Sequence, residues 1–144
     1  MIIFRVDASL KIGTGHVMRC LNLAKILKKN GTDVGFVCCK YEGNLIEKIR
    51  LDGFKVFELE LSTEEKLGNI LFYSNLLETD QQQDAKNCKK ILQRVKVDWL
   101  IIDNYELDYL WHSHARSYCE NIMVIDDLAN RNLDCDILLD QNYC

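Results

Sequence analysis

The sequence predicts an α/β fold in which a parallel sheet carries helices on both faces. Three observations predict it: strand-like and helix-like segments alternate, the strand-like segments are continuous apolar runs, and the helix-like segments repeat apolar residues at helical spacing. Continuous apolar strands are typical of parallel sheets, because both of their faces are buried. Right-handed crossovers then give a doubly wound, Rossmann-like sheet, for which we expect strand order 3-2-1-4-5-6.

The first half of the chain is predicted to hold three strands and two helices. Residues 1–7 form a short apolar strand. Over 16–30 apolar residues recur at helical spacing, and Gly31 is a suitable stop. Three further elements follow in order: a buried strand at 33–39, a helix at 44–53 that a glycine closes, and a strand at 54–61.

The second half is predicted to continue the alternation. Ser62 followed by Glu65 fits a capping box, so we expect a helix from Ser62 to about Gln83, with the polar run QQQD at 81–84 as a break. The remaining predicted elements are a helix at 84–95, a buried strand at 97–103, a helix at 107–119, and two further buried strands at 121–127 and 135–141.

Composition excludes several classes of protein. The chain has 144 residues, which suggests one domain, with 48% apolar and 28% charged residues and a net charge of −4. It shows no basic patch for nucleic acid, no apolar run of membrane-spanning length and no signal peptide at its start, so we expect a cytoplasmic protein. The seven cysteines are odd in number and form no C-x-x-C, which argues against a disulfide framework or a zinc site. Cys38 and Cys39 are expected to be buried free thiols.

The glycine-containing stretch 10–20, LKIGTGHVMRC, is not a dinucleotide or P-loop motif. Met18 stands where the third glycine of G-x-G-x-x-G belongs, and seven residues separate Asp7 from Gly15. The second strand ends in Cys39 and Lys40 rather than in the acid that would bind a ribose, and no G-x-x-x-x-G-K-[ST] occurs. NAD binding is therefore not expected.

His16 is the first candidate for a catalytic residue. It falls in the first turn of a predicted helix, where the positive end of the helix dipole disfavours imidazolium and leaves the neutral ring that a general base needs. Gly13 and Gly15 let the backbone approach a ligand, and Arg19 lies one turn along the same face, able to pair with a carboxylate or a phosphate. The alternative is that His16 packs or caps and that Arg19 is solvated.

Polar side chains at the carboxyl ends of the strands are the other candidates, because ligands bind there in such sheets. The groups after the first and fourth strands flank the switch in strand order and should converge. Tyr105, which follows the fourth strand, is therefore the second choice for a site residue after His16. Asp126 and Asp127 have a helix cap as their alternative role. The candidate ligand-binding positions are Asp7, Ser9, Gly13, Gly15, Arg19, Asp103, Asp126, Asp127, Gln141 and Asn142.

The helix at 107–119 is not expected to contribute chemistry. Leu107, Leu110, Trp111 and Tyr118 are predicted to point inward. His112 and His114 are predicted to be solvated on its surface, and their spacing is not a metal pattern. No metal site is therefore expected.

Four segments resemble, in the same order, the nucleotide-sugar hydrolases of pseudaminic acid biosynthesis and their spore-coat polysaccharide relatives. The segments are F-R-V-D-A-S-x-x-I-G-x-G-H-x-x-R at 4–19, L-I-I-D-N-Y at 100–105, I-D-D-L-A-N-R at 125–131 and C-D-I-L-L-D-Q-N at 135–142. The resemblance covers essentially the whole chain, and the first motif together with the last two is its specific part.

The resemblance implies a fold similar to the GT-B glycosyltransferases, especially the one that adds N-acetylglucosamine to lipid-linked muramyl peptide. Two Rossmann-like domains then hold the active site between them. The implied reaction is hydrolysis of a UDP-diacetamido-trideoxyhexose by water, with inversion at the anomeric carbon and without metal or cofactor. By motif match, His16 takes the general-base position and Tyr105 the family tyrosine, while the sugar side of the cleft is lined by Asp7, Gly13, Gly15, Arg19 and Asn142.

Members of that family are longer than this chain. Residues 1–144 are therefore expected to be the N-terminal domain, with the C-terminal UDP-binding domain missing or supplied by a partner chain, so that the isolated chain binds UDP weakly and turns over slowly or not at all. Two other functions stay open: the acceptor-side domain of a GT-B glycosyltransferase, and a non-catalytic sugar-binding or interaction domain.

Overall fold

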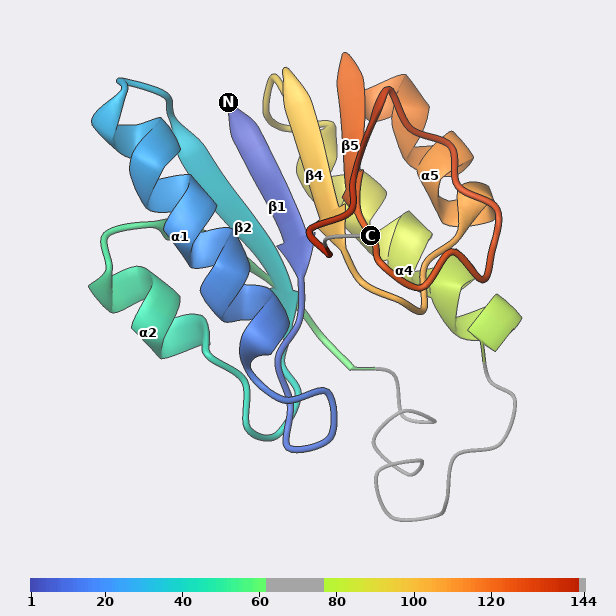
Figure 1. Cartoon of the computed structure of the whole chain (residues 1–144), viewed down its shortest axis with the longest axis horizontal. Coiled ribbons are helices and arrows are strands. Elements are labelled where there is room, and N and C mark those ends of the chain that lie inside the picture. The colour runs from blue at the N-terminus through green and yellow to red at the C-terminus, as the bar shows by residue number, and fades with distance from the viewer. Residues whose placement is uncertain (62–76, 143–144) are drawn as a thin grey trace.

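A computed structural model of the chain describes residues 1–61 and 77–142, with side chains described from 81 onward in the second range, and shows a sheet between layers of helices (Figure 1). Its strands are β1 (Ile2–Val6), β2 (Val34–Cys39), β3 (Lys55–Leu59), β4 (Trp99–Asp103), β5 (Asn121–Ile125) and β6 (Ile137–Leu139). Its helices are α1 (Gly15–Lys29), α2 (Ile46–Leu51), α4 (Leu77–Leu92), α5 (Tyr109–Ala115) and the 3₁₀ turn η1 (Arg116–Tyr118).

The strand order confirms the doubly wound prediction. The six strands pair in parallel in the order β3-β2-β1-β4-β5-β6, so β1 and β4 lie side by side at the switch point. Ile2 pairs with Trp99 and Val6 with Asp103, and the loops after both strands therefore leave the sheet at one place.

Alternate residues of the inner strands fill two separate cores. Phe4 and Val6 of β1 face α1 and α2, where Phe4 stacks on Phe36 of β2 at 5.0 Å. Ile3 of β1 faces α4 and α5 together with Trp111. Burying each such side chain contributes roughly 1.5–3 kcal/mol, so both helical layers hold β1 and β4 rigidly under the loops that follow them.

The predicted break at 81–84 is wrong, because α4 runs through it. Gln81 is buried and its Oε1 accepts a hydrogen bond from the Asp108 amide at 3.2 Å. Asp84 accepts from Arg5 of β1, whose Nη2 lies 2.5 Å from Oδ2, and from the Trp111 indole at 2.9 Å. Internal partners therefore satisfy polar groups that otherwise indicate a loop. The predicted helix start at Ser62 lies outside the described residues.

The second helix of the α4–α5 layer also differs from its prediction. The α-helical part is only Tyr109–Ala115, capped by Asp108, whose Oδ1 accepts from Leu110 N at 2.9 Å. Leu107 and Trp111 are buried as predicted, but Leu110 is exposed. His112 is fully buried rather than solvated, because the segment after β5 covers it and Asp134 N donates to its Nδ1 at 3.2 Å. His114 is exposed, as predicted.

The last predicted strand is shorter than 135–141 and is not buried. β6 is the edge of the sheet, and Ile137, Leu138 and Leu139 are all exposed among the described residues. Cys38 and Cys39 are buried free thiols, as predicted. None of the helices in the two described ranges is long and apolar enough to cross a lipid bilayer.

Candidate functional site

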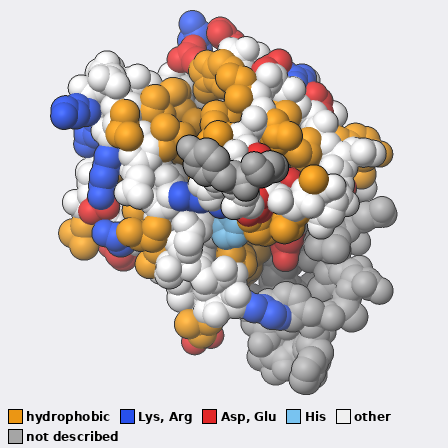
Figure 2. Space-filling model, in the orientation of Figure 1, with side chains coloured by type: hydrophobic (Ala, Val, Ile, Leu, Met, Phe, Trp, Pro, Cys, Tyr) orange, Lys and Arg blue, Asp and Glu red, His pale blue; other side chains and the backbone are white. Residues whose placement is uncertain are grey.

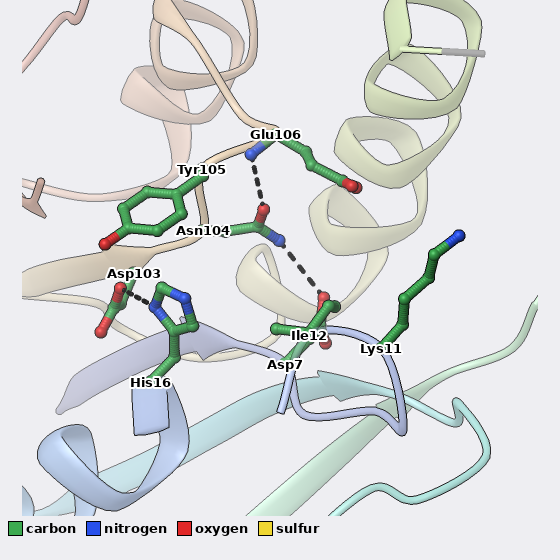
Figure 3. Close-up of a pocket in the computed structure, with 8 residues that line it drawn as sticks. All are labelled: Asp7, Lys11, Ile12, His16, Asp103, Asn104, Tyr105 and Glu106. Carbon is green, nitrogen blue, oxygen red and sulfur yellow. Dashed lines mark hydrogen bonds and ion pairs between the residues drawn. The ribbon is translucent and has the colours of Figure 1, made fainter. Parts of the chain in front are cut away.

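A cavity of about 340 Å³ opens at the carboxyl edge of the sheet, where the β1–α1 and β4–α5 loops meet (Figure 3). The predicted convergence of the groups after the first and fourth strands is therefore observed. Figure 2 shows a small patch of histidine surface near the centre of the view. The His16 side chain keeps 16% of its area exposed. The lining residues are Asp7, Lys11, Ile12, His16, Asp103, Asn104, Tyr105 and Glu106.

The β1–α1 loop is a tight turn that its own polar groups close. Ser9 Oγ accepts from the amides of Lys11 at 3.2 Å and Ile12 at 2.8 Å, and the Ser9 carbonyl accepts from Gly13 N at 2.9 Å. Gly13 adopts a φ of +79°, a left-handed conformation that favours glycine. Ser9 and Gly13, both predicted to bind ligand, thus shape the turn that delivers His16 to the cavity.

Gly15 has a different role from Gly13. It is the first residue of α1, and a Cβ added there would meet nothing within 4 Å. Thr14, which precedes it, makes no side-chain hydrogen bond that caps α1. The space beside Gly15 fits the predicted close approach of a ligand to the backbone.

His16, Arg19 and Asp103 form one hydrogen-bonded group. His16 Nδ1 lies 2.6 Å from Asp103 Oδ1, and Arg19 donates to both Asp103 oxygens, from Nε at 2.5 Å and from Nη2 at 2.5 Å. Asp103, at the end of β4, has a fully buried side chain. Arg19 therefore pairs with a carboxylate of the protein itself, one of the two partners predicted for it.

The charge of this group fixes the roles of the histidine nitrogens. Burial by itself raises the pKa of Asp103, but hydrogen bonds from Arg19 and His16 outweigh burial and hold that pKa below its ordinary value. An ionised carboxylate accepts, so in the neutral ring we expect the hydrogen on His16 Nδ1 and the lone pair on Nε2. Figure 3 shows Nε2 turned away from Asp103 toward the cavity. This arrangement can remove a proton from a molecule bound there.

Tyr105 packs on the other side of the imidazole. Its ring meets the His16 ring edge-on, with centroids 4.6 Å apart and an interplanar angle of 81°. Its hydroxyl donates to Asp127 Oδ1 at 2.5 Å, and Asn142 Nδ2 donates to Asp127 Oδ2 at 3.0 Å. Burial and the Asp127 contact both raise the pKa of Tyr105, so the phenol stays protonated at neutral pH.

Asp7 lines the cavity, but its carboxylate is occupied by scaffold groups. Oδ1 accepts from Cys39 N at 2.7 Å and lies 2.8 Å from Arg5 Nη1, while Oδ2 accepts from Asn104 Nδ2 at 3.3 Å. It is 3% exposed. Asp7 therefore joins β1, β2 and the β4–α5 loop beneath the cavity.

The remaining predicted residues are not among those that line the cavity. Asp126 is buried; its Oδ2 accepts from Ala129 N at 3.1 Å, closing a turn rather than capping a helix. Gln141 is exposed beyond β6. Among the described residues, no three His, Cys, Asp or Glu side chains come together in a way that would hold a metal ion.

Sequence reasoning missed several residues of the site. Lys11, Ile12 and Glu106 line the cavity, and Arg131 contacts its wall from the segment after β5. Ile12 belongs to the 4–19 motif, which was its one sequence signal. Lys11 and Glu106 gave no signal, because the two loops that bring them to the cavity are visible only in three dimensions. Arg131 ends the I-D-D-L-A-N-R segment, which was its one sequence signal.

The sequence of the chain is similar to those of two known proteins over part of their length. No family model matches the chain. It is 27% identical over 121 residues to the uncharacterized protein MJ1062 of Methanocaldococcus jannaschii, a match that covers 84% of this chain and 20% of that protein. It is 37% identical over 70 residues to the UDP-2,4-diacetamido-2,4,6-trideoxy-beta-L-altropyranose hydrolase of Campylobacter jejuni, covering 49% of this chain and 23% of that enzyme.

The second of these matches supports a distant relationship to that hydrolase and hints at a function connected with nucleotide sugars. The matched segments span about a fifth to a quarter of the length of the two relatives.

Proposed function

We propose that this chain is the base-bearing half of a nucleotide-sugar hydrolase that releases UDP from a UDP-diacetamido-trideoxyhexose. The observation that carries the proposal is the 2.6 Å contact between His16 Nδ1 and Asp103, with Nε2 turned into the cavity. The similarity to the Campylobacter jejuni enzyme supports the choice of substrate class.

In this mechanism His16 activates a water molecule. As the water oxygen attacks the anomeric carbon, its proton passes to Nε2, and the bond from that carbon to the UDP oxygen breaks with its electron pair leaving on UDP. Attack on the face opposite the leaving group inverts the configuration. General-base help of this kind is worth about 10²–10⁴-fold in rate.

Asp103 and Arg19 prepare the base. Asp103 holds the imidazole in one tautomer and stabilises the imidazolium that forms, as the acid of a hydrolase triad does. Arg19 holds Asp103 through two donors and keeps it ionised. Tyr105 limits rotation of the ring through its edge-on contact.

We further propose that a second domain, or a partner chain, supplies most contacts to UDP, as in a GT-B arrangement. The cavity offers three acidic side chains and one lysine, a poor setting for a diphosphate by itself. The isolated chain is then expected to work far below the ordinary range of ~1–10³ s⁻¹. Turnover in that range by residues 1–144 alone would contradict this part of the proposal.

The test is prolonged incubation of the chain with the UDP-sugar in ¹⁸O water, comparing the parent with His16→Asn and with His114→Asn as the matched control. We expect UDP release, one ¹⁸O at the anomeric carbon, and a loss of about 10²–10⁴-fold in the rate for His16→Asn alone. Equal rates for parent and His16→Asn would contradict the role of His16.

The same incubation with added sugar acceptors separates hydrolysis from transfer. The pair of His16 and Asp103 that deprotonates water can equally deprotonate the hydroxyl group of a sugar acceptor. If the sugar is transferred to an acceptor and no free sugar forms, the chain is the acceptor-side domain of a glycosyltransferase and not part of a hydrolase. Absence of any chemical-shift change at His16 on adding UDP, UDP-sugar or free sugar would favour a non-catalytic interaction domain.

A further inference from the structure

One wall of the cavity is the β4–α5 loop, which contributes Asn104, Tyr105 and Glu106 to the lining. Two internal hydrogen bonds close the loop: Leu107 N donates to Asn104 O at 3.3 Å, and Glu106 N donates to Asn104 Oδ1 at 2.9 Å. A short loop of this kind needs an outside support if Tyr105 is to stay against His16.

The guanidinium of Arg131 provides that support. Its Nη2 donates to Asn104 O at 3.2 Å and its Nε to Leu107 O at 2.8 Å, so one planar group binds a main-chain carbonyl at each end of the loop. Its carbon Cζ also lies over the Tyr105 ring, 6.0 Å from the centroid.

Arg131 is itself held in place. Its Nη1 donates to Asp126 Oδ1 at 2.6 Å, and the two side chains are only 13% and 3% exposed. The other oxygen of Asp126 fixes the turn at Ala129, which has a φ of +49°. Asp126 therefore ties the Arg131 segment to the end of β5, and Arg131 ties that segment to the β4–α5 loop.

We propose that Arg131 is a positioning residue that sets the cavity wall and, through it, the contact between Tyr105 and His16. Arg131 is not among the residues that line the cavity, so it acts through the loop rather than on a bound molecule. Its planar guanidinium binds the carbonyls of Asn104 and Leu107 and the carboxylate of Asp126 at the same time. A lysine has a single ammonium group and cannot reproduce that geometry. The catalytic consequence rests on the proposed hydrolase function; the structural consequence does not.

The test compares Arg131→Lys and Arg131→Ala with Arg116→Lys as the matched control. Arg116 also binds two carboxylates, those of Asp134 and Asp136, neither of which lines the cavity. The readout is NMR of the Tyr105 and His16 rings in protein carrying ¹³C-labelled tyrosine and histidine, with Tyr105→Phe and His16→Asn used for assignment. Melting temperatures are measured in parallel.

We expect Arg131→Lys to shift both ring signals while its melting temperature changes no more than that of Arg116→Lys, which leaves both rings unchanged. Where UDP release is measurable, Arg131→Lys should lower kcat by about 10–100-fold with a smaller change in KM, as misplacement of a reacting group by about 1 Å does.

Two results would overturn the proposal. One is an unchanged pair of ring signals in Arg131→Lys. The other is loss of dispersed signals throughout the spectrum of Arg131→Lys with Arg116→Lys intact, which would make Arg131 an anchor of the whole fold. If the parent chain releases no UDP, the hydrolase function fails, but the ring signals still decide the role of Arg131.

Discussion

His16 and His112 are the same residue type on helices that follow adjacent strands, yet their surroundings give them opposite properties. His16 sits in the first turn of α1, keeps part of its ring exposed and pairs with the carboxylate of Asp103. His112 lies within α5 and is fully buried. Its Nδ1 accepts from Asp134 N, and its Nε2 finds no hydrogen-bond partner within the described part of the chain.

The difference shows what makes a histidine useful. A carboxylate on one nitrogen and a cavity at the other leave His16 able to take up a proton and have the resulting charge stabilised. Burial, aided by the charge of Arg131, does the reverse to His112 and lowers its pKa to about 4, because Asp108 and Asp134 only partly offset them. The surroundings of His16 fit the proposed proton transfer, whereas those of His112 keep its ring neutral.

The largest effect is expected when the partner of His16 is removed. Asp103→Asn leaves the shape of the side chain but can present its amide to Nδ1, which favours the wrong tautomer and should lower kcat by about 10⁴-fold. The measurement is UDP release, with Asp98→Asn as the control, because the Asp98 carboxylate pairs with the N-terminal amine at 2.6 Å and does not line the cavity.

Melting curves accompany the Asp103→Asn measurement, because Arg19 loses its charged partner in that variant. A rate within threefold of the parent, in a folded protein, would mean that the carboxylate does not act on His16.

The next effect concerns His112 and the stability of the fold. Because its folded pKa of about 4 lies below the ordinary value of 6.5, the unfolded chain binds the proton first as the pH falls. The contribution of His112 to the free energy of unfolding is therefore complete above about pH 6.5 and is lost toward pH 4. The loss is on the order of 3 kcal/mol.

Urea unfolding at pH 7 and pH 4.5 measures this loss. His112→Gln should reduce the difference in unfolding free energy between the two pH values, whereas the exposed control His114→Gln should keep it. A pH difference that is the same in both variants would show that other groups cause the acid sensitivity.

The smallest effect separates the two glycines that precede His16. Gly13→Ala should cost roughly 1 kcal/mol, because alanine resists the left-handed φ of +79°. Gly15→Ala should stabilise α1 by roughly 0.5–1 kcal/mol, since its new methyl group meets nothing within 4 Å. Thermal unfolding of both variants measures the two changes.

Gly15→Ala also tests the expected approach of a ligand. If a UDP-sugar passes close to the start of α1, this variant binds it more weakly despite being more stable, as followed by NMR titration of the His16 ring. Unchanged binding would place the ligand elsewhere in the cavity.

The parts of the molecule that the sequence predicted are those governed by local patterns. Continuous apolar runs identified β1, β2, β4 and β5, and the handedness of crossovers set their order. The same order brought His16 next to Asp103 and Tyr105, because parallel strands end at one edge of the sheet.

The parts that escaped prediction depend on pairs of residues far apart in the chain. The break predicted at QQQD is absent, because partners far away in the chain satisfy its polar groups, as Arg5 and Trp111 do for Asp84. His112 is buried because a later segment covers it, and Arg131 matters through two carbonyls of a loop that precedes it by more than twenty residues. No periodicity or local motif carries such information.

The proposed role of His16 as a base depends most on which of its ring nitrogens holds the hydrogen. ¹⁵N NMR of the His16 imidazole at neutral pH, in the parent chain without ligand, reads the tautomer directly. We predict hydrogen on Nδ1, bonded to Asp103, and a bare Nε2. Arg19 Nη2 also lies 3.2 Å from Nδ1. A spectrum showing hydrogen on Nε2 alone, with Nδ1 accepting from Arg19, would leave no lone pair facing the cavity and would contradict the proposed base.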